Sequence, residues 1–317
     1  MGQKKRTALV TGGSGFIGAH LVKTLLAKNY DVNLITRKNT DFWRLEKELK
    51  FLKINEVSFL DIESLTFLFK KIKPSYIFHL AAYGNYENEK DISKIIETDI
   101  IATKNLLEAS LNIDYKCFVN TGSSSEYGFK KKPMKETDIL EPVSFYAAAK
   151  ASSTLLCSVF AKQFNKNIVT LRPFSVYGPW EKESRLIPVV IKSSLNDKTV
   201  LLTPGTVKRD FIYVEDIVNA YIKAAGTRKN FKGEVFNIGT GVQHSNKDII
   251  RIVEKITGRR LKVQSGKFKK RYWDTDYWVA DVNKTKKYLK WHPKYTLEDG
   301  LRETIKWYGN YLSNNDG

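Results

Sequence analysis

Short apolar runs alternate with longer amphipathic stretches from residue 7 to residue 172. The apolar runs, each a predicted strand, lie at 7–10, 31–35, 57–60, 76–80, 116–120 and 168–171. Stretches with helical spacing follow at 16–28, 42–51, 62–72, 92–111 and 146–164. Strands that are apolar on both faces are typical of a covered parallel sheet, and regular strand–helix alternation provides its crossovers. The pattern predicts an α/β fold with a doubly wound parallel sheet.

Prolines and glycines interrupt this pattern after Arg172. They stand at Pro173, Gly178, Pro179, Pro188, Pro204 and Gly205. These residues favour loops and short elements. One further strand–helix–strand piece follows at 211–238, and the stretch from 246 onward combines helices with an aromatic-rich loop. We therefore expect a Rossmann domain of residues 1–172 plus 209–240, and a smaller mixed α/β substrate domain of residues 173–208 plus 241–317.

A glycine-rich turn joins the first predicted strand to the first predicted helix, with the sequence Thr-Gly-Gly-Ser-Gly-Phe-Ile-Gly at 11–18. Gly12 permits the tight turn, Gly15 lets the backbone approach a pyrophosphate, and Gly18 lets helix and strand pack closely. The helix start at Phe16 and Ile17 offers N–H groups that favour phosphate. The strand–turn–helix context predicts a dinucleotide-binding site, whereas three glycines alone would indicate only a turn.

The end of the second predicted strand bears on which nicotinamide cofactor binds. The sequence at 34–38 is Leu-Ile-Thr-Arg-Lys, without the acidic residue that would bond a ribose 2′-hydroxyl. Arg37 and Lys38 would attract a 2′-phosphate, which arginine can bind with two hydrogen bonds. The sequence favours NADP(H), with NAD(H) or a merely solvated basic loop as alternatives. Asp61, after the third strand, is either a contact of the adenine amino group or a helix N-cap.

A tyrosine and a lysine four residues apart, Tyr146 and Lys150, open the predicted helix at 146–164. That spacing places both side chains on one helical face. A lysine cation lowers a tyrosine pKa from its usual value of about 10, so the pair can exchange a proton with a sugar oxygen. Ser123 is a candidate to hold the same oxygen. A surface tyrosine and lysine would show the same spacing, but the glycine turn favours the catalytic interpretation.

Composition narrows the functional classes. The 317-residue chain carries 53 Lys and Arg against 34 Asp and Glu, a formal net charge of +19. The basic residues are scattered and do not alternate with aromatics, so we expect a small polyanion and no nucleic acid. No apolar run reaches the ~18 residues that span a bilayer, so we expect no membrane partner. The two cysteines, Cys117 and Cys157, predict no metal site, no disulfide framework and a reduced, cytoplasmic protein.

Several motifs together resemble those of extended short-chain dehydrogenase/reductases of the nucleotide-sugar epimerase, dehydratase and ketoreductase type. They are TGGSGFIG at 11–18, FHLAA at 78–82, GSSSEYG at 122–128, YAAAK at 146–150, LRPFSVYGPWE at 171–181, RDFIYVEDI at 209–217 and FNIGTG at 236–241. The resemblance implies that Ser123, Tyr146 and Lys150 form a catalytic triad. It also implies cofactor contacts at Tyr146, Lys150, Ile62, Leu80, Ala81, Ala82 and Pro173. The substrate contacts that it implies are Ser124, Ser175, Arg209 and Arg271.

The chain departs from this family pattern at two places. In the related 4,6-dehydratases an Asp-Glu pair that performs elimination follows the active-site hydroxyl residue, whereas this chain has Ser124 and Ser125 there. Glu126 comes one place too late, so we expect no dehydratase activity. Ser175 stands where family members usually have asparagine, which predicts one altered substrate contact.

The resemblance is greatest to CDP-abequose/paratose-type and dTDP-fucose-type synthases. We therefore expect an NADPH-dependent reduction of a keto group, at C4, of a nucleotide-linked deoxyhexulose that feeds polysaccharide or glycoside assembly. The alternative is an NAD-dependent nucleotide-sugar 4-epimerase, and a more distant one is a non-catalytic NADP- or RNA-binding protein. In this family the helices predicted at 92–111 and 146–164 pair across a homodimer, although they would equally serve to cover the sheet.

Overall fold

The computed structural model describes residues 6–86, 88–202, 207–227, 229–265 and 275–315. The chain divides into two compact units. The first contains the residues up to Gly128 together with 139–173 and 218–237. The second contains 129–138, 174–217 and the residues from Ile238 onward.

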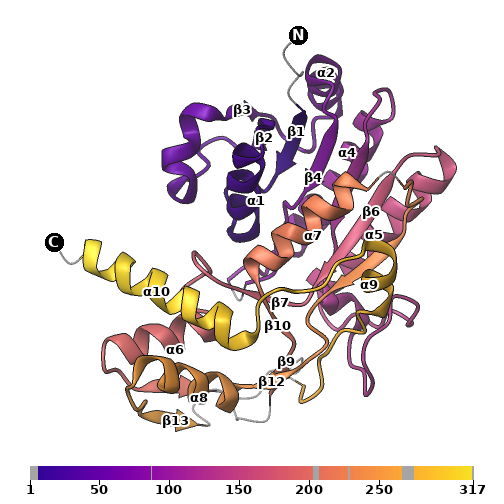
Figure 1. Ribbon diagram of the computed structural model, residues 1–317. Helices are drawn as coiled ribbons and strands as arrows, with labels where there is room; N and C mark the ends of the chain where they lie inside the picture. The colour runs from indigo at the N-terminus through magenta and orange to yellow at the C-terminus, as the bar shows by residue number, and fades with distance from the viewer. Residues whose placement is uncertain (1–5, 87, 203–206, 228, 266–274, 316–317) are drawn as a thin grey trace. The chain divides into compact units, whose positions relative to one another are not determined.

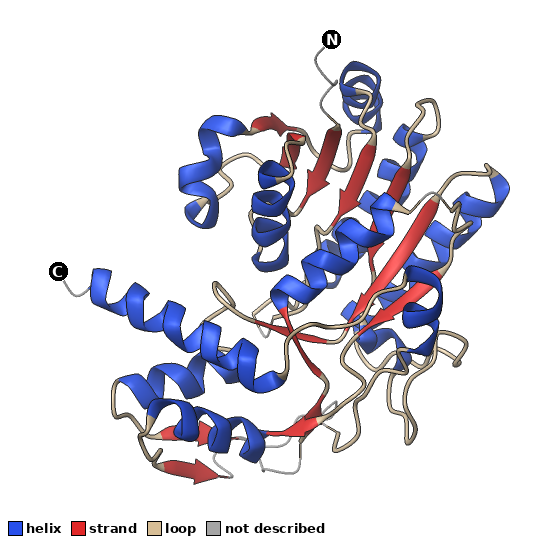
Figure 2. Ribbon diagram, viewed as in Figure 1, coloured by secondary structure: helices blue, strands red, loops and turns tan. Residues whose placement is uncertain are grey.

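A seven-stranded sheet forms the centre of the first unit (Figures 1 and 2). Its strands are β1 (Thr7–Thr11), β2 (Asp31–Thr36), β3 (Lys53–Glu56), β4 (Tyr76–His79), β5 (Cys117–Thr121), β6 (Ile168–Pro173) and β11 (Val235–Ile238). Their order is β11-β6-β5-β4-β1-β2-β3, and the five pairs from β6 to β3 are parallel. From β1 the chain adds β2 and β3 on one side, and it then returns to add β4, β5 and β6 on the other side of β1. The sheet is therefore wound in both directions from β1. The predicted doubly wound Rossmann fold is confirmed.

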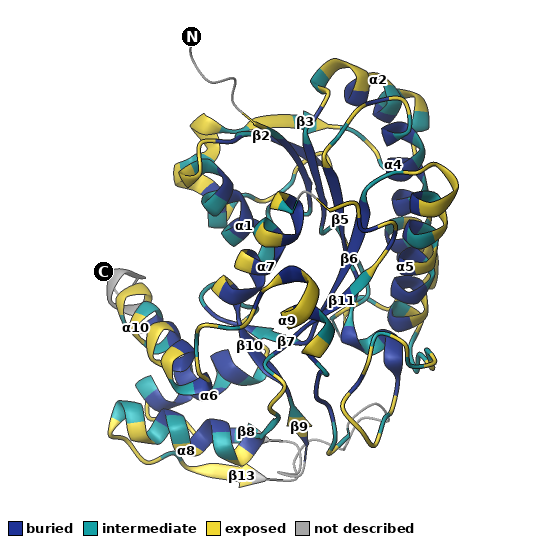
Figure 3. Ribbon diagram, turned by 45° about the vertical axis from the view of Figure 1, so that its right-hand side comes forward, coloured by how far each residue is buried: buried dark blue, intermediate teal, exposed yellow. Residues whose placement is uncertain are grey.

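Helices cover both faces of this sheet. They include α1 (Phe16–Ala27), α2 (Ile62–Ile72), α4 (Ala102–Ser110), α5 (Phe145–Gln163) and α7 (Val214–Gly226). Figures 1 and 3 show α1 and α7 on one face and α2, α4 and α5 on the other. On the second face, side chains of α2, α4 and α5 pack in one buried cluster with Leu9, Ile77 and Phe118 of the strands. Burial on both faces explains why the strands lack polar alternation.

The third strand lies earlier than the sequence pattern indicates. Residues 57–60 were expected to form it, but β3 is Lys53–Glu56. This edge strand is mostly exposed and so carries no continuous apolar run. Val57 and Phe59 follow it in a loop and pack partly against the core cluster. Their apolar character therefore reflects core packing rather than strand structure.

The helix expected at 92–111 is not uniform. It consists of α3 (Ile92–Ile95), a π-helical segment η2 (Ile96–Ile101) and α4. The π segment places the carboxylate of Asp99 in the interior, where it is fully buried. Short π segments are frequent at functional sites, because the widened turn redirects side chains.

The second unit contains helices α6 (Leu186–Leu195), α8 (Asn246–Thr257), α9 (Asn283–Leu289) and α10 (Leu297–Asn315) with three two-stranded pieces. In one piece β7 (Ser175–Tyr177) pairs in parallel with β10 (Phe211–Tyr213). Because of that pairing, residues 209–217, which were expected in the Rossmann domain, belong to the second unit. Residues 129–138 also cluster here, since the backbone N–H of Met134 donates to Val279.

Candidate active site

The glycine-rich turn after β1 has a shape that only glycine accommodates at two positions. Gly12 has a φ of +68°, and a Cβ there would lie 2.6 Å from the backbone of Leu80 and Ala81. A Cβ on Gly18 would overlap the carbonyl oxygen of Gly12. Gly15 is the N-cap of α1, and no acidic side chain stands in the first turn of that helix. The turn and the helix start therefore fit a bound pyrophosphate.

Hydrogen bonds tie this turn to the segment that follows β4. The Thr11 hydroxyl oxygen accepts the N–H groups of Leu80 and Ala81, each at 3.2 Å. Leu80 and Ala81 are half-buried and Ala82 is exposed, so this segment presents accessible surface next to the turn. Pro173, by contrast, is buried at the end of β6.

The end of β2 lies beside the glycine turn, because Ile35 is the register partner of Thr11. Arg37 and Lys38 follow directly and are exposed. Thr36 is 6% exposed, and its hydroxyl has no hydrogen-bond partner among the described residues. The sequence reasoning missed Arg44, whose guanidinium donates to the carbonyl of Ser14 in the turn at 3.3 Å. Arg37, Lys38 and Arg44 thus lie near the glycine turn. The Thr36 hydroxyl, which has no hydrogen-bond partner among the described residues, lies at the end of β2 as well.

Asp61 acts as a helix cap. Its carboxylate accepts the backbone N–H of Ser64 at 3.0 Å at the start of α2, and these bonds to the helix start lower its pKa. Of the two roles expected for Asp61, this is the one seen in the structure. Ile62 is the first residue of the same helix and is half-buried.

Tyr146 and Lys150 lie one turn apart at the start of α5, as their spacing predicts. Ser144 caps this helix by accepting the N–H of Ala147 at 3.1 Å. Tyr146 is half-buried, whereas Lys150 is 1% exposed. An ammonium group at that depth requires an anionic partner. That partner is Asp99, whose Oδ1 lies 3.5 Å from the Lys150 Nζ.

Ser123 lies just beyond β5 and caps the short 3₁₀ helix η3 (Ser124–Tyr127). Its hydroxyl is 2.7 Å from that of Ser125 and accepts the N–H of Ser125. Its own N–H donates to Glu126 at 2.7 Å, which completes a capping box. The loop geometry of Ser123 is therefore set by the acid three residues later. Ser124, a predicted substrate contact, is 6% exposed.

Glu126 also accepts a buried salt bridge from Arg172 on β6, at 2.8 Å. The Arg172 guanidinium donates further to the Tyr127 hydroxyl, which donates to Asn237 on β11. Both carboxylate oxygens of Glu126 therefore have protein donors. Arg172 donates to Oε2, and Thr154 on α5 donates to Oε1. Glu126 thus anchors the serine loop.

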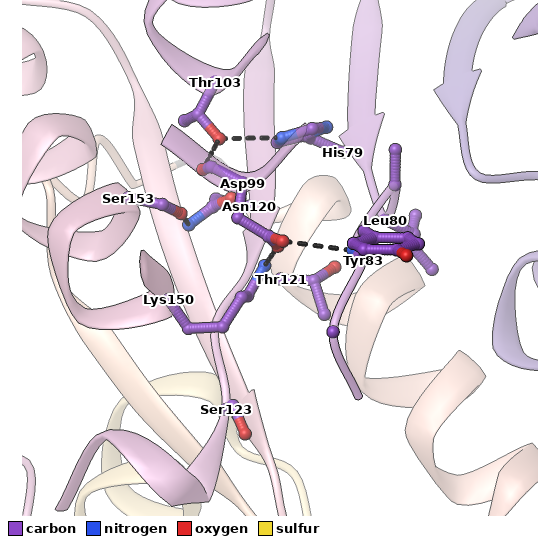
Figure 4. Close-up of polar contacts among 12 residues, drawn as sticks. His79, Leu80, Tyr83, Asp99, Thr103, Asn120, Thr121, Ser123, Lys150 and Ser153 are labelled. Atoms are coloured by element: carbon purple, nitrogen blue, oxygen red, sulfur yellow. Dashed lines mark hydrogen bonds and ion pairs between the residues drawn. The ribbon is translucent and has the colours of Figure 1, made fainter. Parts of the chain in front are cut away.

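A hydrogen-bonded series in the first unit joins Thr11, at the start of the glycine turn, to the residues around Lys150. Figure 4 shows the part of this series formed by His79, Thr103 and Asp99. The Thr103 hydroxyl donates to the carbonyl of Asp99, so it accepts from the His79 Nε2 at 2.9 Å. The His79 Nδ1 then accepts from Thr11 at 2.7 Å. Burial, with a smaller effect of Lys150, lowers the pKa of His79 to about 3, so its ring is neutral.

Two of the predicted substrate contacts, Ser175 and Arg209, are described and lie outside the first unit. Ser175 begins β7 and is half-buried. Arg209 donates to the carbonyls of Lys208 and Thr275, and its guanidinium lies 5.3 Å from the centre of the Trp278 ring. Arg271 lies outside the residues that the structure describes.

Sequence reasoning missed Asp99, His79 and Thr11 as part of this site. One signal was present for Asp99, because it lies four residues after Ile95 and three before Ala102 on the buried stripe of its helix. An acid on such a stripe indicates a buried partner. The described residues contain no group of three metal-ligating side chains. No helix in the described part of the chain is long and apolar enough to cross a membrane.

Comparisons with known proteins agree with this geometry. The UDP-glucuronate 4-epimerase of Thermodesulfobacterium geofontis is 30% identical over 94% of this chain and 95% of its own length. The crystal structure of UDP-glucuronic acid 4-epimerase from Bacillus cereus, with UDP-glucuronic acid and NAD, has a TM-score of 0.87 and 32% identity, covering 96% of this chain and 99% of its own. That of UDP-glucose 4-epimerase from Thermotoga maritima, with UDP-glucose, has a TM-score of 0.86 and 29% identity, with coverage of 96% and 99%.

A family model matches most of the chain as well. It is described as the NAD dependent epimerase/dehydratase family and covers residues 8–239. The match contains the glycine turn, Ser123, Tyr146 and Lys150. The chain belongs to the NAD dependent epimerase/dehydratase family.

Proposed function

We propose that this protein is a nucleotide-sugar 4-epimerase that inverts the configuration at C4 of a UDP-linked hexose or hexuronic acid. The observation that carries the proposal is full-length similarity, at about 30% identity, to 4-epimerases of both UDP-glucuronate and UDP-glucose. These comparisons favour the 4-epimerase over the keto reduction that the sequence motifs suggested first. The chain also lacks an elimination pair, since Ser124 and Ser125 occupy those positions.

The chain's own residues would carry the proton transfer. A nicotinamide dinucleotide, with its pyrophosphate at the glycine turn, would supply a hydride acceptor and donor for C4 when it is bound. Tyr146 takes the proton of the C4 hydroxyl as that carbon is oxidised and returns it when the opposite face is reduced. Lys150 stabilises the phenolate by its charge, and Ser123 holds the same sugar oxygen by a hydrogen bond.

Measuring the interconversion of UDP-sugars by the purified protein, without added cofactor, tests this function. Purified protein would be incubated with UDP-glucose, UDP-glucuronic acid and their C4 epimers, and the products resolved by NMR. An epimerase interconverts one pair with no net change in nicotinamide absorbance. Consumption of NADPH in step with a reduced product from a 4-keto sugar would instead establish a reductase.

A second candidate is the NADPH-dependent 4-ketoreductase, which the end of β2 favours. Arg37 and Lys38 are exposed there and no acid is present. We expect Arg37→Asp to weaken NADPH binding more than NADH binding, because a carboxylate repels a 2′-phosphate. Titration of each cofactor by fluorescence measures this. Equal weakening of both would remove the 2′-phosphate assignment.

We also propose that the protein forms a homodimer through α5 and the π segment η2. Leu155 and Val159 on α5 are more than half exposed, and Ile96 and Ile101 on η2 are about 40% exposed. The two elements pack on each other, so these side chains belong to neighbouring helices. Apolar side chains gathered on adjacent helices are typical of a protein–protein interface.

A further inference from the structure

Asp99 is a carboxylate with no exposed surface, held inside the first unit. Its Oδ2 accepts the backbone N–H of Tyr83 at 3.0 Å, and its Oδ1 faces the Lys150 ammonium at 3.5 Å. Figure 4 shows both contacts converging on this carboxylate. Tyr83 belongs to the segment after β4, so Asp99 joins that segment to α5.

The backbone around Asp99 is arranged to bring the carboxylate to this point. It lies in η2, where the widened π turn departs from the α-helical path of α3 and α4. The Thr103 hydroxyl donates to its carbonyl at 2.7 Å, and His79 holds that hydroxyl in turn. Burying a carboxylate is costly unless it is paired, so this position requires a cation.

Among the described residues, the other titratable groups near Asp99 do not supply that cation. His79 on β4 is neutral. Glu89, from the segment after β4, is itself an acid and is bonded to the N–H groups of Gly84 and Tyr86. Burial raises the pKa of Asp99, and the Lys150 ammonium opposes that rise. Lys150 is therefore the group that balances the charge.

We propose that Asp99 is the buried counter-ion of Lys150 and fixes its ammonium group in position, which makes Asp99 a positioning residue for proton transfer by Tyr146. The proposal rests on the proton-transfer role proposed above for Tyr146 and Lys150. Without the carboxylate, the buried ammonium group has no anionic partner, which disfavours its charged form. The phenolate would then lose the charge that stabilises it.

The pH dependence of turnover in Asp99→Asn tests this role. Asparagine keeps the shape and removes the charge, so we expect kcat to fall roughly 10- to 100-fold, as when a supporting contact is lost. The alkaline limb of the kcat profile should also move to lower pH, because the ammonium group then lies in a buried site without an anion. Asp91→Asn is the matched control, since Asp91 is an exposed cap at the start of α3. Its profile should match that of the unmodified protein.

A thermal double-mutant cycle tests the pair without any assay of turnover. Asp99→Asn and Lys150→Met should each lower the melting temperature, because each leaves one charge buried and unpaired. The double variant should melt above the lower of the two, and it should fold even if Asp99→Asn alone does not. Additive losses, or an alkaline limb that stays in place in Asp99→Asn, would overturn the proposal. Full activity of Lys150→Met would instead refute the acid–base role on which it rests.

Discussion

At the scale of single residues, the titratable side chains of the site differ in how far they are buried. Tyr146 is half-buried, whereas Lys150 and Asp99 are inaccessible. A group that exchanges protons with substrate must be reachable, and the charges that support it act best where water is excluded. This arrangement supports the proposal that the tyrosine transfers the proton and that the buried pair provides electrostatic support.

Substitution of Tyr146 by phenylalanine tests that assignment. Because only the hydroxyl is removed, we expect the chemical step to slow by roughly 10²- to 10⁴-fold while the fold is retained. Single-turnover kinetics would measure the rate, and fluorescence titration would measure cofactor binding. Binding should persist in this variant, and its loss would indicate misfolding rather than a missing proton donor.

Glu181 illustrates an acid whose burial has no catalytic assignment. One of its oxygens is buried with no hydrogen-bond partner among the described residues. Burial raises its pKa to about 8, and Arg185 opposes the rise. The folded pKa lies above the unfolded value of 4.5, so the stability contributed by the neutral form is lost as pH rises from about 4.5 to about 8.

We therefore expect Glu181→Gln to stabilise the protein in a pH-dependent way. Glutamine stays neutral, so the gain should be near zero below pH 4.5 and grow to roughly 1–3 kcal/mol above pH 8. Urea unfolding at pH 5 and pH 9 measures both limits. A gain of equal size at the two pH values would show that ionisation of this carboxyl is not the cause.

At the scale of elements, the glycine turn and its helix form a rigid unit. Gly18 packs against Gly12, and the positive φ of Gly12 brings the turn against Leu80 and Ala81. The sequence predicted this unit in full, because its conformation is dictated by local steric limits. It could not predict β3, since an edge strand needs no apolar pattern and its pairing depends on β2.

Gly18→Ala should abolish cofactor binding, because the added methyl group would displace the turn that fits a pyrophosphate. Isothermal titration with NAD and NADP measures the loss. Gly309→Ala is the matched control. A Cβ there meets no atom within 4 Å, so this helical substitution should leave binding intact and stabilise the fold by up to about 1 kcal/mol. Normal binding in Gly18→Ala would place the cofactor elsewhere.

At the scale of the whole molecule, the first unit buries its sheet on both faces and still leaves apolar side chains on α5 and η2 exposed. Leu155 is 59% exposed and Val159 is 54% exposed. A helix that covers a sheet needs one apolar face. A second, exposed apolar face on the same helix indicates that another protein surface packs against it. The interface proposed above would bury these side chains in a second copy of the chain.

The double variant Leu155→Asp/Val159→Asp should convert a dimer into a monomer, because each carboxylate would be buried without a partner. Sedimentation velocity measures the mass directly. Val242→Asp is the control, since Val242 is also 54% exposed but lies outside α5 and η2. A variant that remains dimeric, or an unmodified chain that is monomeric, would contradict this interface.

The sequence by itself determined the parallel sheet, the glycine turn and the Tyr146–Lys150 spacing. Each depends on a period or a steric limit that acts over a few residues. Only the tertiary structure decided that Lys150 meets Asp99, 51 positions earlier, and that Arg172 meets Glu126, 46 positions earlier. Buried charges pair through the packing of distant elements, and no local pattern specifies which elements these are.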